Sequence, residues 1–176
     1  ETTGTQGSAP RLLLARPNSY DYGEQTDAAL WIAAAVECGV AAKLECVDAL
    51  HLIPTQRYAG ELISYRDFSW RIPVSNYLSV AEKNGATHIV YLEFEPLDNA
   101  KGIMHVRIVD IDNSESELWA EVTAAADSLE QAVDAIVNET ALAVGVPLDP
   151  SIETVDVFGA DAGQIRRAAT VIIAES

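Results

Sequence analysis

The sequence predicts an α/β (α+β) domain with a mixed sheet of about five strands, an antiparallel C-terminal meander, and three main helices packed on one face of the sheet. Three observations predict this class. Short apolar runs at 11–17 and 50–55 flank a long helical pattern. The segments 87–97, 102–111 and 117–124 then alternate apolar and polar residues. An amphipathic helical pattern follows them, so the expected order is β-α-β-(α)-α-β-β-β-α.

The first strand and helix occupy the N-terminal part of the chain. Residues 11–17, RLLLARP, form an apolar run that suits a buried strand stopped by Pro17. A helix is expected from about Thr26 to Asp48, with Thr26 or Asp27 as its N-cap. Gly39 in its middle costs about 1 kcal/mol relative to alanine. Nearly every face of the helix carries apolar or small residues, so it should be well buried. Its apolar stripe consists of Ile32, Val36, Val40, Leu44 and Val47.

The next segment contains a second strand and shorter helices. Residues 50–55, LHLIPT, predict a strand that ends at Pro54. Residues 56–63 predict a short helix or turn, and a loop follows it. A helix then runs from Pro73 to Lys83, and Gly85 ends it in the C′ position, where a positive φ costs little.

Period-two alternation marks the three strands of the meander. In 87–97 one face carries Val90, Leu92 and Phe94, and the other carries Ile89, Tyr91, Glu93 and Glu95. In 102–111 and 117–124 the apolar faces are Met104, Val106 and Ile108, and Leu118, Ala120 and Val122. Such alternation is typical of an antiparallel sheet with one face covered.

The last predicted helix is the most clearly marked one, and it closes the main domain. Asp127 or Ser128 is the expected N-cap, with Glu130 or Gln131 as the capping-box partner, and Gly145 and Pro147 end the helix. We therefore divide the chain into a flexible N-terminal segment (1–10), the α/β domain (11–147) and a C-terminal extension (148–176). Within the extension, 154–158 predicts a brief strand and 162–176 a helix that docks on this domain or begins a further element.

The chain is strongly acidic. Its formal net charge is −16 and its pI is about 4.3. Such a surface repels phosphate backbones and anionic lipids, so we expect no binding to nucleic acid or to a membrane surface. The simplest role of this acidity is solubility.

The start of the chain says little about its compartment. Residues 1–10, ETTGTQGSAP, are small and polar, like a linker or the start of a processed product. A signal peptide would already have been removed from such a product. No run approaches the roughly 20 apolar residues that span a bilayer, so no transmembrane segment is expected in this chain.

The two cysteines predict neither a disulfide nor a zinc site. Cys38 and Cys46 would lie about 12 Å apart along one helix, which is too far for a disulfide. There is no CxxC motif and no Cys/His spacing typical of zinc. We therefore interpret both cysteines as small buried apolar residues.

The acidic stretch 109–121, VDIDNSESELWAE, resembles a calcium loop at first sight. Asp110, Asp112 and Ser114 have the required spacing, and Glu121 stands at the twelfth position. However, Glu115 occupies the sixth position, where the loop requires glycine, and the flanking elements are strands. Asp, Asn and Ser are also typical turn residues, so we interpret the stretch as a hairpin turn and expect no metal there.

A second cluster of charged residues lies on the polar face of the meander. Glu93 and Glu95 are expected across from His105 and Arg107, with Glu117 and Glu121 on the next strand. Carboxylates beside a histidine could perform acid–base chemistry in a pocket, but on an exposed sheet they are cross-strand ion pairs. We favour the ion pairs. The sequence also contains no nucleophile, phosphate-loop, dinucleotide or zinc-protease motif, so no catalytic residue and no cofactor are expected.

The order of these elements, with a few marked residues, resembles the TolB N-terminal-domain group. In that pattern a "GA" precedes a strand, and the next strand runs into an acidic turn and a tryptophan, followed by an amphipathic helix. Here GATHIVYLEFE, Ile108–Asp110, Ser116–Trp119 and Leu129–Val144 occupy those places. The resemblance covers about residues 11–147 and extends to the CsgG-like envelope proteins.

The resemblance implies a non-catalytic protein-interaction domain of a bacterial cell-envelope assembly. Such domains work in the periplasm or at the outer membrane by docking onto envelope proteins, sometimes as homo-oligomers. Similar domains also occur in cytoplasmic multidomain regulators, so a small-molecule-sensing or regulatory domain of a larger protein is the alternative.

Two surfaces are candidates for partner binding. One is an exposed edge strand that accepts a partner strand. The other is an aromatic-rich tract, because aromatic side chains anchor protein interfaces. Filling of the core is the alternative role of these rings, which are Tyr58, Tyr65, Phe68, Trp70 and Tyr77.

Overall fold

A computed structural model of the chain describes residues 8–19, 24–64, 74–113, 117–152 and 155–158. The elements, in order, are β1 (Arg11–Ser19), α1 (Glu24–Glu45), β2 (His51–Leu52), the 3-10 turn η1 (Thr55–Arg57), α2 (Ala59–Ser64), α3 (Val74–Lys83), β3 (His88–Pro96), β4 (Lys101–Asp110), β5 (Glu117–Ala125), α4 (Leu129–Val144) and η2 (Pro150–Ile152). The predicted class, α+β with a mixed five-stranded sheet, is confirmed.

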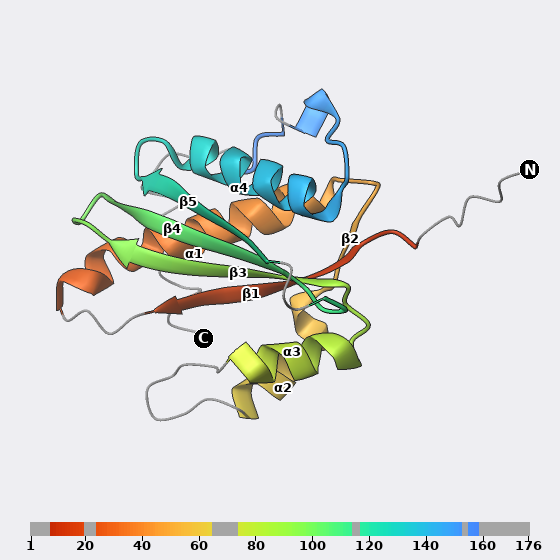
Figure 1. The fold of residues 1–176 in the computed structure, drawn as a ribbon. Coiled ribbons are helices and arrows are strands. Elements are labelled where there is room, and N and C mark those ends of the chain that lie inside the picture. Colours follow the sequence, from red (N-terminus) through yellow and green to blue (C-terminus); the bar gives the residue numbers. More distant parts are fainter. Residues whose placement is uncertain (1–7, 20–23, 65–73, 114–116, 153–154, 159–176) are drawn as a thin grey trace, which may run out of the picture.

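The strand order in the sheet is β2-β1-β3-β4-β5 (Figure 1). β1 is parallel to both β2 and β3, whereas β3, β4 and β5 form the predicted antiparallel meander. The sequence predicted that the first strand ends at Pro17, but β1 continues to Ser19. The register with β3 shifts between Ala15 and Asn18, because proline has no N–H to donate to the ladder and is tolerated at such an irregularity. β2 is shorter than predicted and stops just before Ile53 and Pro54.

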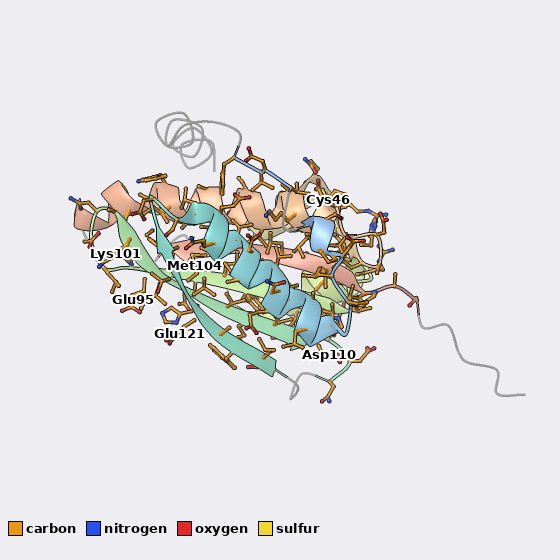
Figure 2. The ribbon with its side chains drawn as sticks, turned by 90° about the horizontal axis from the view of Figure 1, so that it is seen from above. Cys46, Glu95, Lys101, Met104, Asp110 and Glu121 are labelled. Atoms are coloured by element: carbon orange, nitrogen blue, oxygen red, sulfur yellow. The ribbon has the colours of Figure 1, made fainter. Side chains whose placement is uncertain are left out.

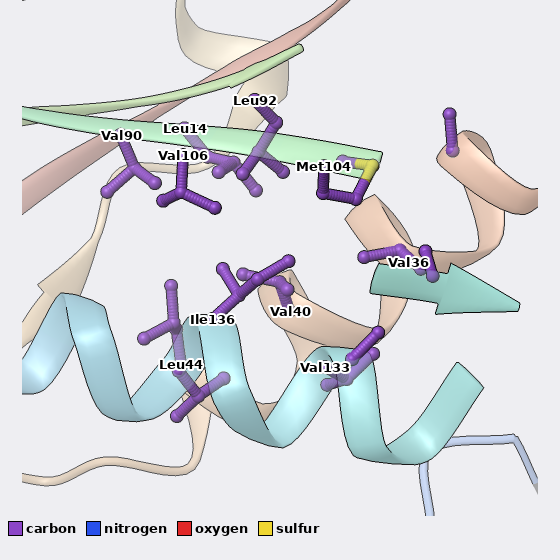
Figure 3. Close-up of a cluster of buried hydrophobic side chains, with 14 of the residues drawn as sticks. Leu14, Val36, Val40, Leu44, Val90, Leu92, Met104, Val106, Val133 and Ile136 are labelled. Carbon is purple, nitrogen blue, oxygen red and sulfur yellow. The ribbon is translucent and has the colours of Figure 1, made fainter. Parts of the chain in front are cut away.

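A first hydrophobic core lies between the sheet and two helices. Alternate side chains of β1, β3 and β4 point toward α1 and α4, which cover the same face of the sheet (Figures 1 and 3). The strands contribute Leu14, Val90, Leu92, Met104 and Val106, and the helices contribute Val36, Val40, Leu44, Val133 and Ile136. The apolar stripe predicted for the first long helix is therefore confirmed as core.

A second, smaller core lies on the opposite face. It joins Leu13, Ile89 and Tyr91 of the sheet to Tyr77 and Val80 of α3. This corrects the expectation that all three main helices pack on one face, because α3 lies across the sheet from α1 and α4 (Figure 1). β1 and the first half of β3 are apolar at both odd and even positions, so each of their faces requires a covering layer.

The contact between α1 and α4 explains Gly39. A Cβ atom added to Gly39 would lie 2.7 Å from Val133 Cγ2 and 3.1 Å from the Cζ atom of Phe158. The glycine therefore permits a close approach of α4 and of the segment after η2. What looked like a local weakness in the helix is a requirement of packing.

An ion pair lies in the same contact between the helices. The Lys43 side chain has no exposed surface, and its Nζ lies 2.5 Å from Asp134 Oδ1 and 3.1 Å from Glu130 Oε1. Burial lowers the pKa of Lys43, but the hydrogen bonds to Asp134 and Glu130 outweigh it, so the pKa lies above its ordinary 10.5. Lys43 therefore remains charged at neutral pH and ties α1 to α4.

The helix ends agree with the sequence only in part. Gly85 and Gly145 have φ values of 68° and 70°, as expected for residues that end helices. Ser128 is the N-cap of α4, but its side chain makes no capping hydrogen bond, so the predicted capping box is wrong in this detail.

Two further expectations need correction. Cys38, on α1, and Cys46, in the turn after α1, are both exposed and not buried as the sequence suggested. Residues 155–158 form no strand, while 153–154 and the expected C-terminal helix lie outside the described residues. Within the described part of the chain, no helix has the length and apolar character to cross a membrane.

We expect Gly39→Ala to destabilise the protein by about 1–3 kcal/mol, because the clash with Val133 and Phe158 exceeds the gain in helix propensity. Gly60→Ala in α2 is the matched control, since nothing lies within 4 Å of its added Cβ. It should be neutral or stabilising by up to about 1 kcal/mol. Urea denaturation measures both changes, and a loss of similar size in the two variants would contradict the packing role of Gly39.

We expect Lys43→Met to cost about 1–3 kcal/mol, because it leaves two partly buried carboxylates without their cation. Lys83→Met is its control, since the Lys83–Glu61 pair is exposed at the lysine and should contribute less than about 0.5 kcal/mol. A raised pKa in the folded state means that the contribution of Lys43 is complete below pH 10.5 and is lost as the pH rises further. Urea midpoints at pH 7 and pH 11 check both statements; equal losses in the two variants at pH 7 would refute them.

Candidate functional site

The side of the meander opposite α1 and α4 carries the candidate site. α2 and α3 cover this side near β1 and β3 (Figure 1). Toward β5 its side chains become progressively more exposed. We call this surface the open face and define it by Tyr91, Glu93 and Glu95 of β3, His105 and Arg107 of β4, and Glu117, Trp119, Glu121 and Thr123 of β5.

Strand register arranges an acidic row across the open face. Glu93 is opposite His105, and His105 is opposite Glu121. His105 Nε2 lies 2.9 Å from Glu95 Oε2, and its Nδ1 lies 3.4 Å from Glu121 Oε1. Figure 2 shows Glu95 and Glu121 near each other and far from Asp110, which lies toward the other end of the sheet. The imidazole thus lies between two carboxylates.

An aromatic row runs beside the acidic one. Arg107 is opposite both Tyr91 and Trp119, and its guanidinium carbon lies 5.6 Å and 5.1 Å from the centroids of these rings. Glu117 accepts two hydrogen bonds from Arg107, including Nε at 2.9 Å, and a third from Trp119 Nε1 at 2.9 Å. The Trp119 indole is therefore held in place although 63% of the residue is exposed.

Tyr91 connects the aromatic row to the second core. Its ring meets the Tyr77 ring edge-on, with the centroids 5.6 Å apart. Tyr77, Tyr91, Arg107 and Trp119 therefore form a continuous line of contacts from α3 to β5. Such cation–π and edge contacts each contribute about 0.5–1.5 kcal/mol.

The neighbours of the ionisable groups on the open face shift the pKa values of several of them. Hydrogen bonding to Arg107 lowers the pKa of Glu117, and the same bonds raise the pKa of Arg107. Burial raises the pKa of Glu93, with His105 opposing the shift. Burial also raises the pKa of Tyr91 to about 12. The Arg107–Glu117 pair consequently stays charged across the neutral range, and the arrangement suits recognition by charge and by an aromatic surface.

The sequence predicted the charged members of this site but overlooked Trp119. Glu93, Glu95, His105, Arg107, Glu117 and Glu121 share one face as expected. The Arg107–Glu117 ion pair favoured from the sequence is present, and the ring nitrogens of His105 contact Glu95 and Glu121. Trp119 lies on the same face, and the sequence did not predict its exposure. An aromatic residue between two glutamates on the polar side of a strand was the available signal.

Two residues of the aromatic tract that the sequence offered as a candidate binding surface are buried in the structure. Tyr58 and Tyr77 are each only 2% exposed, and both belong to the second core. Tyr58 donates a hydrogen bond of 2.8 Å from its hydroxyl to the Leu14 carbonyl. Filling of the core, the alternative role, therefore accounts for these two rings, and they offer almost no surface to a partner. The other three candidates, Tyr65, Phe68 and Trp70, lie outside the described residues.

The described start of the acidic stretch, residues 110–113, has the bonding of the predicted turn. Asp110 Oδ1 accepts hydrogen bonds from the backbone N–H groups of Asp112, at 2.9 Å, and Asn113, at 3.3 Å. This is the local bonding that the turn interpretation required. Among the residues that the structure describes, no group of three or more His, Cys, Asp or Glu side chains is placed to hold a metal ion.

Comparison with solved structures supports a TolB-like fold. TolB from Acinetobacter baumannii matches with a TM-score of 0.52 and 15% identity, over 81% of this chain and 30% of the TolB chain. This chain therefore corresponds to less than a third of that protein. The CsgG-like part of the resemblance finds no support in these comparisons.

Two envelope-protein structures are more distantly similar. The LpoB C-terminal domain from Salmonella enterica shares 12% identity over 69% of this chain and 87% of its own, with a TM-score of 0.43. Lipoprotein GNA1162 from Neisseria meningitidis shares 14% identity over 74% of this chain and 96% of its own, with a TM-score of 0.44. No family model and no curated protein matches the sequence.

We expect Glu117→Gln to cost about 1 kcal/mol at pH 7, because it weakens the hydrogen bonds from Arg107 and Trp119. The pKa of Glu117 is lowered in the folded state, so its contribution is present above its ordinary value of 4.5 and is lost as the pH falls below it. Glu121→Gln is the control, and its exposed carboxylate should contribute less than about 0.5 kcal/mol. Urea midpoints at pH 7 and pH 3 test this; a difference between wild type and Glu117→Gln that is unchanged at pH 3 would contradict it.

Proposed function

We propose that this chain is a non-catalytic protein-interaction domain of a bacterial cell-envelope assembly, periplasmic or associated with the outer membrane. The open face is the proposed docking surface. The observation that carries the proposal is Trp119, which is 63% exposed although Arg107 and Glu117 fix its orientation.

A fixed and exposed tryptophan is the type of side chain that anchors protein interfaces. Tryptophan and arginine dominate the residues whose truncation weakens complexes most. Binding normally has an entropic cost because interface side chains must be ordered. This cost is about 0.5–1.5 kcal/mol of binding free energy for each flexible side chain. Here the contacts of Trp119 with Arg107 and Glu117 exist before any partner arrives, so much of that cost is already met.

The state of the charged groups supports a binding role over catalysis. Arg107 is engaged by Glu117, and His105 lies between Glu95 and Glu121 on an exposed sheet. Acid–base catalysis requires groups whose protonation equilibrium is tuned in a pocket shielded from water. On this surface the pairs act as cross-strand ion pairs that fix side-chain positions.

The placement in the cell envelope rests on two further supports. The sequence pattern over about residues 11–147 resembles the TolB N-terminal-domain group, whose members dock onto envelope proteins. The fold resembles part of TolB from Acinetobacter baumannii.

Site-specific photo-crosslinking tests the proposal. A photoreactive phenylalanine analogue is placed at position 119, on β5, or at position 142, on α4, and the protein is irradiated in cell-envelope extract. Leu142 is a matched control, because it is an exposed apolar residue on a different element, with 72% of its surface accessible. We expect one or two discrete adducts from position 119 and none of the same mass from position 142. Identical adducts from both positions, or none from position 119, would count against docking through the open face.

A further inference from the structure

β5 is the last strand of the sheet on the side of the meander. The direction of its backbone groups follows from one hydrogen bond, in which Ala126 N–H donates to the Ala100 carbonyl at 2.8 Å. Because the direction alternates along a strand, Leu118, Ala120, Val122 and Ala124 also face β4. The N–H and C=O groups of Trp119, Glu121 and Thr123 then point away from the sheet. Among the described residues, no other strand lies there to pair with them.

The side chains of β5 would present two different surfaces to an added strand. On the helix side, Leu118, Ala120 and Val122 are only partly buried and border the first core. On the open face, Trp119, Glu121 and Thr123 are exposed. An incoming strand with alternating residues would therefore place apolar side chains beside α4 and polar ones beside Trp119 and Glu121.

Charge distinguishes between the strands that could occupy this edge. The chain carries a net charge of −16, so two copies repel each other. In the symmetric register centred on Glu121, self-pairing also sets that carboxylate opposite its own copy, which is destabilising. Glu121 is 72% exposed at its side chain and Glu95 is 47% exposed, and both lie around His105. These features favour a strand that carries positive charge.

We propose that β5 binds a basic, extended segment of a partner protein, which adds to the sheet as a further strand. Alternate Lys or Arg side chains of that segment lie on the open face beside Glu121, and one of its side chains packs on the Trp119 indole. The inference rests on the proposed function and names the binding mode and the partner's chemistry. Backbone hydrogen bonds supply affinity, and the charges supply specificity.

The probes are three eight-residue peptides that alternate valine with lysine, glutamate or threonine. Each is titrated into the ¹⁵N-labelled chain at low salt, and amide chemical shifts are followed. We expect the lysine peptide to shift the amides of Trp119, Glu121 and Thr123 and to bind at least about tenfold more tightly than the glutamate peptide. Its affinity should fall as salt is added. Equal binding of the three peptides, or shifts that map to another element, would overturn the proposal.

Two variants separate the backbone from the charge. Thr123→Pro removes an outward N–H and no bond of the β4–β5 ladder, so the fold should persist while the affinity for the lysine peptide falls by at least about tenfold. Glu121→Lys leaves the backbone intact and should reverse the preference toward the glutamate peptide. Unchanged lysine-peptide binding in either variant, once its folded spectrum is confirmed, would overturn the proposal. A dimer would also overturn the proposal. If sedimentation shows that the wild-type chain is a dimer and that Thr123→Pro dissociates it, the edge of β5 holds a second copy of the chain.

The crosslinking experiment keeps the two proposals distinguishable. Adducts from position 119 that persist in a Thr123→Pro background would sustain the docking function and overturn strand addition. Adducts that disappear in that background support both. Absence of adducts in the wild-type background, with peptide binding intact, would count against the envelope function alone.

Discussion

The parallel pairing of β1 with β3 is the constraint on which the rest of the structure depends. Where they pair, residues 12–15 of β1 and the first half of β3 are apolar on both sides, so alternate residues enter different cores. Leu12 and Leu14 enter the core with α1 and α4, whereas Leu13 and Ala15 enter the core that contains Tyr58 and α3. A shift of one residue in register would exchange every one of these side chains between the cores. The pairing thus fixes two helical layers at once, and the α1–α4 layer is further constrained by Gly39 and Lys43.

The same pairing explains why an open face exists. Along one side of β3 the residues change from Ile89 and Tyr91 to Glu93 and Glu95. Antiparallel β4 makes the matching change, from Val109 to Arg107 and His105. The apolar part lies beneath α3, and the charged part extends past it toward β5. The change from apolar to charged residues along β3 and β4 therefore marks the edge of the region that α3 covers.

Local patterns were sufficient to predict most of the elements and the charged part of the site, but not the arrangement of the layers. Alternation in the meander predicted which charged residues share a face, because neighbours on a strand determine that relation. It could not predict that α3 lies on the opposite side of the sheet, since residues 12–15, LLLA, are apolar throughout and do not reveal which helix covers which face. For the same reason the sequence left open whether Tyr58 and Tyr77 are surface anchors or core residues, and Cys38 was interpreted as a buried residue. Burial of an aromatic ring or a thiol depends on the element packed above it, which neighbours in sequence do not specify.

The line of contacts from Tyr77 to Trp119 gives the edge strand an unusual degree of support. An edge strand usually gains its order from one neighbour, and its exposed side chains are free to change rotamer. Here Arg107 lies over both Tyr91 and Trp119, and Tyr91 packs against Tyr77, so the exposed indole is connected to a buried ring of α3 through two intermediate residues. Glu117 fixes the arginine and the indole together. A surface built in this way needs little reorganisation on binding, and the Trp119 ring, the exposed Glu121 carboxylate and the backbone of β5 are the parts that a partner can use.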